Sequence, residues 1–199
     1  IDHPLCQAVF SRQGAQLLHF QPKGQKPWLW CAAKWPQVGA IRGGVPVCWP
    51  WYGRHPSENA WPSHGWARLI DWKLLDSSSD DDGVRLHWQL QLCDWQVDLR
   101  AHLGERMDLR LSTEHQDSLP CQLSQALHAY WRIGDVVEVA LSGLEGAQGY
   151  DQLNRQICHQ EGELRVEGGC QRVFQHDGEL QIKDHAWQRE LCIDTGDHA

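Results

Sequence analysis

The stretch that decides the fold is "GVRLHWQLQLCDWQVDLRAHL", residues 83–103, in which apolar and polar residues alternate. Every second residue of its first half is apolar: Val84, Leu86, Trp88, Leu90 and Leu92. A period of two residues is typical of a half-buried β-strand, because successive side chains of a strand point to opposite faces. The stretch therefore predicts strand structure with one face turned towards a core.

The same alternation recurs in "MDLRLSTEH" (107–115), "DVVEVALSGL" (135–144) and "GELQIKD" (178–184). Turn-forming residues separate these runs, and we interpret "DSSSDDDG" (76–83) as a long hairpin loop. No window of about a dozen residues shows the helical period. Many short strands at this spacing predict an all-β fold, a single antiparallel sandwich or barrel domain over residues 1–199.

Charge and hydropathy exclude two classes of partner. The chain has 199 residues and a net charge of -8 at pH 7, without a basic run that would follow a nucleic-acid backbone. No apolar stretch approaches the roughly 18 residues that a membrane helix needs. The first ten residues, "IDHPLCQAVF", lack the basic and apolar regions of a signal peptide. We expect a cytoplasmic protein that binds neither nucleic acid nor membrane.

The eight cysteines stand apart in the sequence, with no C-x-x-C pair that would indicate a zinc or redox centre. A disulfide framework is typical of short secreted chains, and this chain is neither short nor visibly secreted. Most of the cysteines lie in apolar runs. We therefore predict that they are small buried hydrophobic residues.

Twelve tryptophans are several times the ordinary usage, and eight of them lie in the Pro- and Gly-rich first third of the chain: Trp28, Trp30, Trp35, Trp49, Trp51, Trp61, Trp66 and Trp72. Core packing accounts for tryptophans in general. Aromatic faces on irregular loops also suit the C–H faces of a sugar ring, so a carbohydrate site is an open alternative.

Two segments place an arginine beside glycine or small residues: "AIRGGVPVCWPW" (40–51) and "WPSHGWARLIDW" (61–72). Arg42 lies between apolar residues and looks buried. Two guanidinium groups on neighbouring loops would suit one phosphate, because the arginine fork matches anionic oxygens. Alternatively, Arg42 and Arg68 form ion pairs with carboxylates such as Asp71 or Glu58.

These segments resemble the glucose-6-phosphate 1-epimerases of the aldose 1-epimerase superfamily. The resemblance is carried by "GAQLLHFQPKGQKPWLW" (14–30), "IRGGVPVCWPWYG" (41–53), "HGWAR" (64–68) and "LSQALHAYWRIGDVVEVALSGLEGAQGYDQL" (123–153), and it weakens after about residue 154. It implies a large antiparallel β-sandwich of the galactose-mutarotase type, with the sugar site in a cleft across one concave face.

The resemblance also implies roles for individual residues. Arg42 and Arg68 match the arginines that hold the substrate phosphate, and His128 matches the catalytic histidine. His64 matches a histidine that lines the site. Ser63 stands where a relative has glutamine, so one substrate contact is shortened or replaced by water.

The chain departs from the family pattern at two places. The family's general base is a glutamate near the C-terminus. One alignment puts it beyond Ala199, so that residues 1–199 lack the terminal strands, and a rival alignment makes Asp194 the base. Gln171 stands where relatives carry an aspartate that contacts substrate or orients the histidine.

The resulting hypothesis is an isomerase that interconverts the α and β anomers of a hexose 6-phosphate without a metal or cofactor. His128 titrates near neutral pH and can give a proton to the ring oxygen and retrieve it. The alternative is an inactive sugar-phosphate-binding module on the same fold. The preferred hexose and the oligomeric state stay open.

Overall fold

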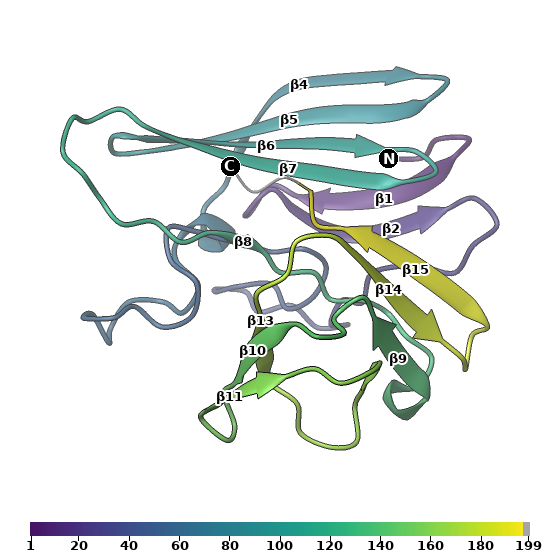
Figure 1. Cartoon of the computed structure of the whole chain (residues 1–199). Helices are drawn as coiled ribbons and strands as arrows, with labels where there is room; N and C mark the ends of the chain where they lie inside the picture. The colour runs from purple at the N-terminus through teal and green to yellow at the C-terminus, as the bar shows by residue number, and fades with distance from the viewer. Residues whose placement is uncertain (197–199) are drawn as a thin grey trace. The chain divides into compact units, whose positions relative to one another are not determined.

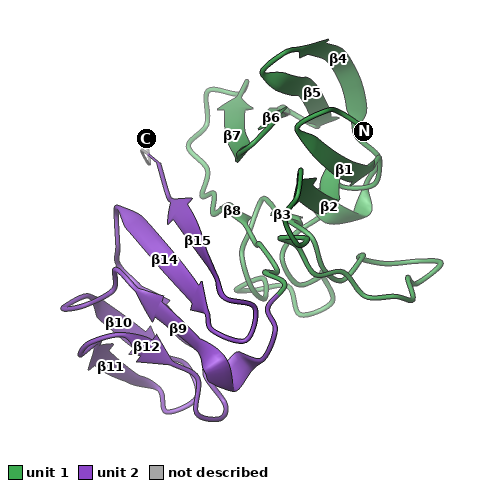
Figure 2. Cartoon of the chain, turned by 90° about the vertical axis from the view of Figure 1, so that its right-hand side faces the viewer, with its two compact units in different colours: residues 1–132 green, residues 133–199 purple. Residues whose placement is uncertain are grey.

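The computed structural model describes residues 1–196, and nearly all of its regular structure is β-strand. The helices in that part of the chain are two three-residue 3-10 turns, η1 (Ala67–Leu69) and η2 (Val136–Glu138). No helix among these residues has the length and apolar character needed to cross a membrane. The chain divides into two compact units, Ile1–Arg132 and Ile133–Ala199, which Figure 2 colours separately.

The largest sheet of the first unit is an antiparallel meander in the order β4-β5-β6-β7 (Figure 1). Its strands are β4 (Lys73–Asp80), β5 (Gly83–Leu92), β6 (Trp95–Leu103) and β7 (Met107–His115). The β5–β6 register places buried residues opposite one another: Leu86 and Ala101, Trp88 and Leu99, Leu90 and Val97. The apolar face predicted from residues 83–103 is therefore the buried face of this sheet.

The prediction of a long loop at 76–83 is wrong. Asp76–Asp80 continue strand β4, and the turn consists of Asp81 and Asp82 alone. β4 is an edge strand, and all eight of its residues are exposed. Serine and aspartate side chains stay in water on both of its faces while its backbone pairs with β5. Such a strand shows no apolar alternation in its sequence.

A second layer of the first unit contains β1 (Cys6–Ser11) and β2 (Gln16–Pro22), which pair antiparallel. Trp49 and Trp72 are buried against the inner face of the four-stranded sheet. An adjoining cluster packs around β1 and β2: Cys6, Ala8, Leu17, Phe20, Leu29, Val45 and Leu103. Two layers of strands around this core make the first unit a β-sandwich.

The second unit contains two small sheets, in the orders β12-β9-β14-β15 and β11-β10-β13. Their strands are β9 (Val139–Ser142), β10 (Gln148–Asp151), β11 (Gln156–His159), β12 (Leu164–Arg165), β13 (Arg172–Phe174), β14 (Glu179–Asp184) and β15 (Arg189–Asp194). The predicted strand at 178–184 is confirmed as β14. The run at 135–144 begins instead with η2, because the Asp135 carboxylate accepts the Val137 N–H and caps that turn.

The prediction that the cysteines are buried is confirmed for Cys6 and Cys48 and is wrong for half of the set. Four are exposed: Cys93, Cys121, Cys170 and Cys192. Cys93 illustrates the reason, because it lies beyond the end of β5 in the turn to β6, although its neighbours in sequence read as an apolar run. The side chain is exposed because the strand ends before it. The alternation of apolar and polar residues in the sequence locates strand ends poorly.

The exposed thiols of the first unit should react faster than the buried ones. In the folded protein we expect iodoacetamide at about pH 8 to label Cys93 and Cys121 quickly and to leave Cys6 and Cys48 unlabelled. Burial raises the pKa of the Cys48 thiol to about 11, so both access and thiolate formation oppose its reaction. Peptide mapping after a timed pulse measures this order. Labelling in guanidinium chloride, where all four should react, is the control. Rapid labelling of Cys48 in the folded state would contradict the packing around it.

Candidate active site

His128 is held by a backbone ladder within the first unit. Strand β3 (Val47–Cys48) pairs antiparallel with β8 (Ala126–Leu127), and the ladder continues on both sides of this short pair. The His128 N–H donates to the Pro46 carbonyl at 3.1 Å, and the Tyr130 N–H donates to the Gly44 carbonyl at 2.8 Å. In an extended segment, side chains two residues apart share a face. His128 and Tyr130 therefore project to the same side, where their ring centroids lie 4.9 Å apart.

The loop that follows β3 brings His64 to the same place. An isolated bridge joins Trp49 to Gly65, and a Cβ atom at Gly65, whose φ is +74°, would overlap the Trp49 carbonyl. The His64 N–H donates to the Gly53 carbonyl at 2.7 Å, and the Gly53 N–H donates to His64 Nδ1 at 3.1 Å. Because Nδ1 accepts, the neutral His64 ring carries its proton on Nε2.

Four rings surround this point: His64, His128, Tyr52 and Tyr130. The two imidazoles lie 5.8 Å apart, and Tyr52 lies 4.8 Å from His64 and 6.1 Å from His128 between centroids. Burial lowers the pKa of His128, and the nearby Arg68 lowers it further. The pKa of His64 is lowered by burial first, and then by Arg68 and His128. Both imidazoles are therefore neutral at neutral pH.

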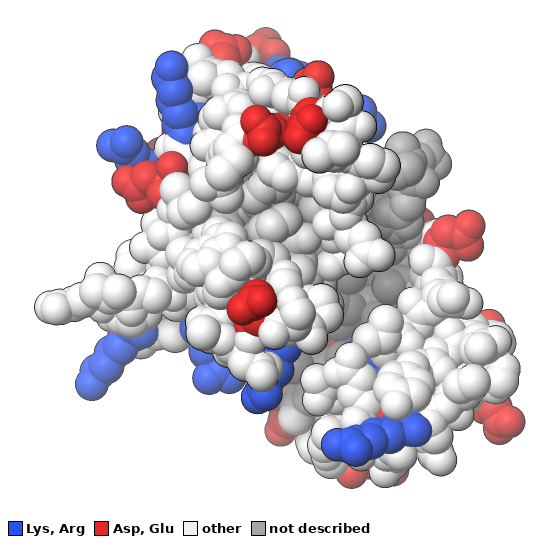
Figure 3. Space-filling model, turned by 90° about the vertical axis from the view of Figure 1, so that its left-hand side faces the viewer, with Lys and Arg blue, Asp and Glu red and all other residues white. Residues whose placement is uncertain are grey.

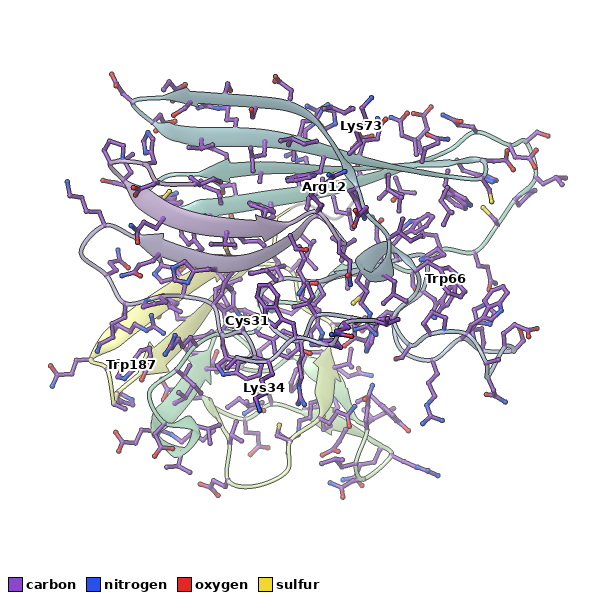
Figure 4. The ribbon with its side chains drawn as sticks, turned by 180° about the vertical axis from the view of Figure 1, so that it is seen from behind. Arg12, Cys31, Lys34, Trp66, Lys73 and Trp187 are labelled. Carbon is purple, nitrogen blue, oxygen red and sulfur yellow. The ribbon has the colours of Figure 1, made fainter. Side chains whose placement is uncertain are left out.

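Arg68 lies on η1. Trp66, which Figure 4 labels beside that turn, directly precedes η1 in the sequence. One terminal nitrogen of the Arg68 guanidinium donates to the Ser63 carbonyl. Its Nε is buried and has no hydrogen-bond partner within residues 1–196. A buried guanidinium N–H without an acceptor is costly, and an anionic ligand is the acceptor that would satisfy it.

Arg42 was expected to be buried, and this is wrong: its side chain is exposed. The backbone on either side of it is buried at Ile41 and Gly43, which explains the apolar surroundings in sequence. Within residues 1–196, neither Arg42 nor Arg68 forms an ion pair, so the alternative of pairing with Asp71 or Glu58 is wrong. Both guanidinium groups lack a carboxylate partner in the part of the chain that the structure describes.

The structure brings together four of the predicted site residues: Ser63, His64, Arg68 and His128. The Ser63 hydroxyl donates to the Gly53 carbonyl at 3.2 Å, so it belongs to the turn that orients His64. Gln171 and Asp194 belong to the second unit, and both are exposed. Gln171 directly precedes β13, and Asp194 ends β15, where it accepts the Gly196 N–H. Their roles stay predictions, as does a general base beyond Ala199, a position that lies outside the described residues.

Two groups stand out among the tryptophans of the first third. Trp49 and Trp72 belong to the core and are fully buried. Trp51 and Trp61 stack with ring centroids 5.3 Å apart, and Trp66 lies 6.0 Å from both. Trp61 keeps 44% of its surface exposed, so one aromatic face is open on the loop that carries Ser63 and His64. A sugar-binding role for that face stays a prediction.

Sequence reasoning missed the two tyrosines. Tyr130 follows His128 at a spacing of two, a signal that an extended segment would place it on the same face. Tyr52 gave no such signal, because only the bend after Trp51 returns it to His64. Burial raises the pKa of the Tyr52 phenol, which keeps it protonated at neutral pH.

The residue pattern of the family described as "Aldose 1-epimerase" matches residues 1–198. The chain belongs to this family. It is 36% identical over 165 residues to the "Putative glucose-6-phosphate 1-epimerase" of Salmonella typhimurium, an alignment that covers 77% of this chain and 54% of the relative. The protein of the same name in Escherichia coli strain K12 is 37% identical over 165 residues, with the same coverage. The chain thus spans about half the length of the curated relatives it matches.

Two solved structures share the fold. A "putative mutarotase (YeaD)" from Salmonella typhimurium superposes with a TM-score of 0.89 at 30% identity, covering 96% of this chain and 68% of that one. The crystal structure of HI1317 superposes with a TM-score of 0.84 at 27% identity, covering 96% and 70%. The predicted all-β sandwich of the mutarotase type is confirmed.

Titration of the two histidines tests the electrostatics of the site. We expect the NMR titration midpoints of His64 and His128 to lie below the ordinary histidine value of about 6.5. Removing a positive charge favours the imidazolium, so Arg68→Met should raise both midpoints. His128 should still titrate low, because burial is the larger cause of its shift. Arg100→Met, which removes an exposed cation on β6, is the matched control. Unchanged midpoints in Arg68→Met would contradict the placement of Arg68.

Proposed function

We propose that this protein interconverts the α and β anomers of a hexose 6-phosphate, with glucose 6-phosphate as the first candidate. The observation that carries the proposal is the guanidinium of Arg68, whose buried Nε has no acceptor within residues 1–196, beside two neutral imidazoles. It provides a cation that lacks an anion next to groups able to transfer protons. The names of the relatives support the same activity.

In this proposal Arg68 and Arg42 bind the phosphate. Arg68 is half-buried and directed by its hydrogen bond to the Ser63 carbonyl, so it supplies a fixed charge. Arg42 is exposed and lies on a different backbone segment from Arg68, so it supplies a second positive charge from the solvent side. Two guanidinium groups can share the oxygens of one phosphate, and a partly buried pair interacts more strongly than an exposed one.

The chemistry requires two proton transfers. Ring opening takes the proton from the hydroxyl on C1 and delivers a proton to the ring oxygen as the bond between C1 and that oxygen breaks. Rotation about the C1–C2 bond and re-closure produce the other anomer, and the protons return. His128 is the proposed acid towards the ring oxygen. Burial and then Arg68 lower its pKa, so His128 must gain a proton before the ring opens. A bound phosphate would offset the charge of Arg68 and favour the imidazolium, which donates to the ring oxygen and is regenerated on closure.

The general base is a separate group in this proposal. His128 is surrounded in the first unit by His64, Tyr52 and Tyr130, none of which is a carboxylate. We expect the base to be a carboxylate on the other side of C1. The alternatives are a glutamate beyond Ala199 and Asp194. Asp194→Asn in the full-length protein distinguishes these alternatives. The substitution should abolish anomer exchange only if Asp194 is the base.

Two further features of the proposal concern organisation and compartment. We infer a single domain, because the family pattern spans residues 1–198 and thus crosses the boundary between the two units. Cys93 and Cys121 are exposed thiols, a state that suits a reducing compartment such as the cytoplasm. Lys and Arg side chains on the face that Figure 3 shows are scattered and form no continuous basic patch there, which fits a small anionic substrate better than a nucleic acid.

Phosphate preference is the first test. The protein should bind glucose 6-phosphate more tightly than glucose in calorimetry, and added salt should reduce the difference because exposed Arg42 is screened. Arg68→Met and Arg42→Met should each remove about 1.5–3 kcal/mol of that preference, the range for hydrogen bonds to charged groups. Arg106→Met, in the turn between β6 and β7, is the control and should leave the preference unchanged. Equal affinity of the native protein for both sugars would overturn the assignment of the arginines.

Turnover is the second test. In the full-length protein, His128→Ala and His128→Asn should slow anomer exchange by about 10²–10⁴-fold, since neither side chain can shuttle a proton. Affinity for glucose 6-phosphate should persist, because the proposed phosphate ligands are Arg68 and Arg42 and not His128. Polarimetry or exchange NMR measures the rate, and His102→Asn, on the polar face of β6, is the control. Undiminished exchange in His128→Ala would contradict the mechanism, and retained affinity without any exchange in the native protein would favour a binding module.

A further inference from the structure

Two glutamines, Gln13 in the turn between β1 and β2 and Gln16 at the start of β2, contact the backbone of the two arginine-bearing segments. Gln16 is fully buried, with 0% of its surface exposed, in a region where its neighbours are apolar. Burying an amide is costly, and an apolar side chain of the same size would fill this space without that cost. The presence of glutamine here therefore needs a reason other than packing.

The hydrogen bonds of Gln16 supply that reason. Its Nε2 donates to the Gly43 carbonyl at 2.6 Å and to the Ile41 carbonyl at 3.2 Å, the two carbonyls on either side of Arg42. The Arg42 carbonyl itself accepts the Ala32 N–H at 2.9 Å. Three consecutive peptide groups around Arg42 are thus held. The opposite orientation of the amide would turn its oxygen towards two carbonyl oxygens, so the nitrogen must point this way.

Gln13 makes the equivalent connection between the two arginines. Its Nε2 donates to the Gly39 carbonyl at 2.8 Å, three residues before Arg42, and to the Arg68 carbonyl at 3.1 Å. The next residue, Gly14, packs so closely on Arg68 that a Cβ there would lie 2.9 Å from the Arg68 Cα. One side chain therefore ties the segment of the exposed arginine to the backbone of the half-buried one.

We propose that Gln13 and Gln16 are positioning residues that set the separation and direction of Arg42 and Arg68, and thereby the selectivity for a phosphorylated sugar. This inference rests on the proposed function, in which those two arginines bind the phosphate. A pair of guanidinium groups binds one phosphate well only at a suitable spacing, because bidentate geometry is directional. Exposed Arg42 has no ion pair within residues 1–196 that could hold it, so the order of its backbone decides where its charge lies.

The test uses methionine, which keeps the length of glutamine and removes the donors. In the full-length protein, the ratio of glucose to glucose 6-phosphate dissociation constants is measured by calorimetry. Gln13→Met and Gln16→Met should each lower this ratio about fivefold, the effect of losing the ordering from one or two hydrogen bonds, while glucose affinity changes less than about twofold. Gln21→Met, on the same strand, removes a bond to the Gln25 carbonyl instead and should leave the ratio unchanged.

Double variants show whether the glutamines act through the arginines. In the Arg68→Met variant, adding Gln13→Met should not lower the ratio further. In the Arg42→Met variant, adding Gln16→Met should likewise leave the ratio unchanged. Additive effects in both cycles would overturn the inference. A general structural role would lower the affinity for both sugars together and leave the ratio unchanged, which would also overturn it.

Failure of this inference is distinguishable from failure of the proposed function. If the native protein does not prefer glucose 6-phosphate, the proposed function is wrong. If it does prefer that sugar and the folded methionine variants keep the whole preference, the inference alone is wrong. Thermal melts identify folded variants, and Gln13→Met decides the matter if Gln16→Met does not fold, because Gln13 is only half-buried.

Discussion

The candidate site depends on the close approach of the segment Gly43–Cys48 to backbone on both of its sides. On one side Val45 donates to the Leu17 carbonyl at 2.8 Å and Gly44 donates to the Trp30 carbonyl at 2.7 Å. On the other side the segment accepts from His128 and Tyr130. Gly44 has a φ of +63°, and a Cβ there would overlap the Leu17 carbonyl. A side chain at this position would therefore force the segment that follows Arg42 away from β2.

The same arrangement explains the electrostatics of the site. His64 and His128 are partly withdrawn from water beside Arg68, so the charged form of each is disfavoured and its pKa is lowered. Arg68 cannot lose its proton, so the positive charge resides on it alone. In the proposed function a substrate phosphate would neutralise that charge. The site thus combines a permanent cation for binding with neutral rings for proton transfer, and burial is the common cause.

Much of the fold was predictable where one face of a strand is buried and the other is solvated. Residues 83–103 and 178–184 are such cases, because the buried and solvated faces of these strands appear in the sequence as alternating apolar and polar residues. Strand β4 could not be recognised, because an edge strand exposed on both faces has no such contrast. Cys93 and Arg42 were misjudged for a related reason: neighbouring apolar residues indicate that a segment is near the core, while the direction of one side chain depends on where the strand ends.

The sequence by itself determined the strand class and the family resemblance and nominated candidate site residues, because motifs such as "IRGGVPVCWPWYG" and "HGWAR" keep their spacing along the chain. The spacing of two between His128 and Tyr130 was a usable signal that the sequence analysis did not use. Only the tertiary structure decided that Tyr52 and His64 meet His128, that Arg68 lacks a carboxylate within residues 1–196, and that Gln13 and Gln16 hold both arginine segments. Many of these contacts join residues far apart in the sequence, as in the bond from Gln16 to the Ile41 carbonyl, 25 residues away, and that from Gln13 to the Arg68 carbonyl, 55 residues away. No local pattern encodes them, because backbone hydrogen bonds between distant segments depend on which strands become neighbours and not on side-chain periodicity.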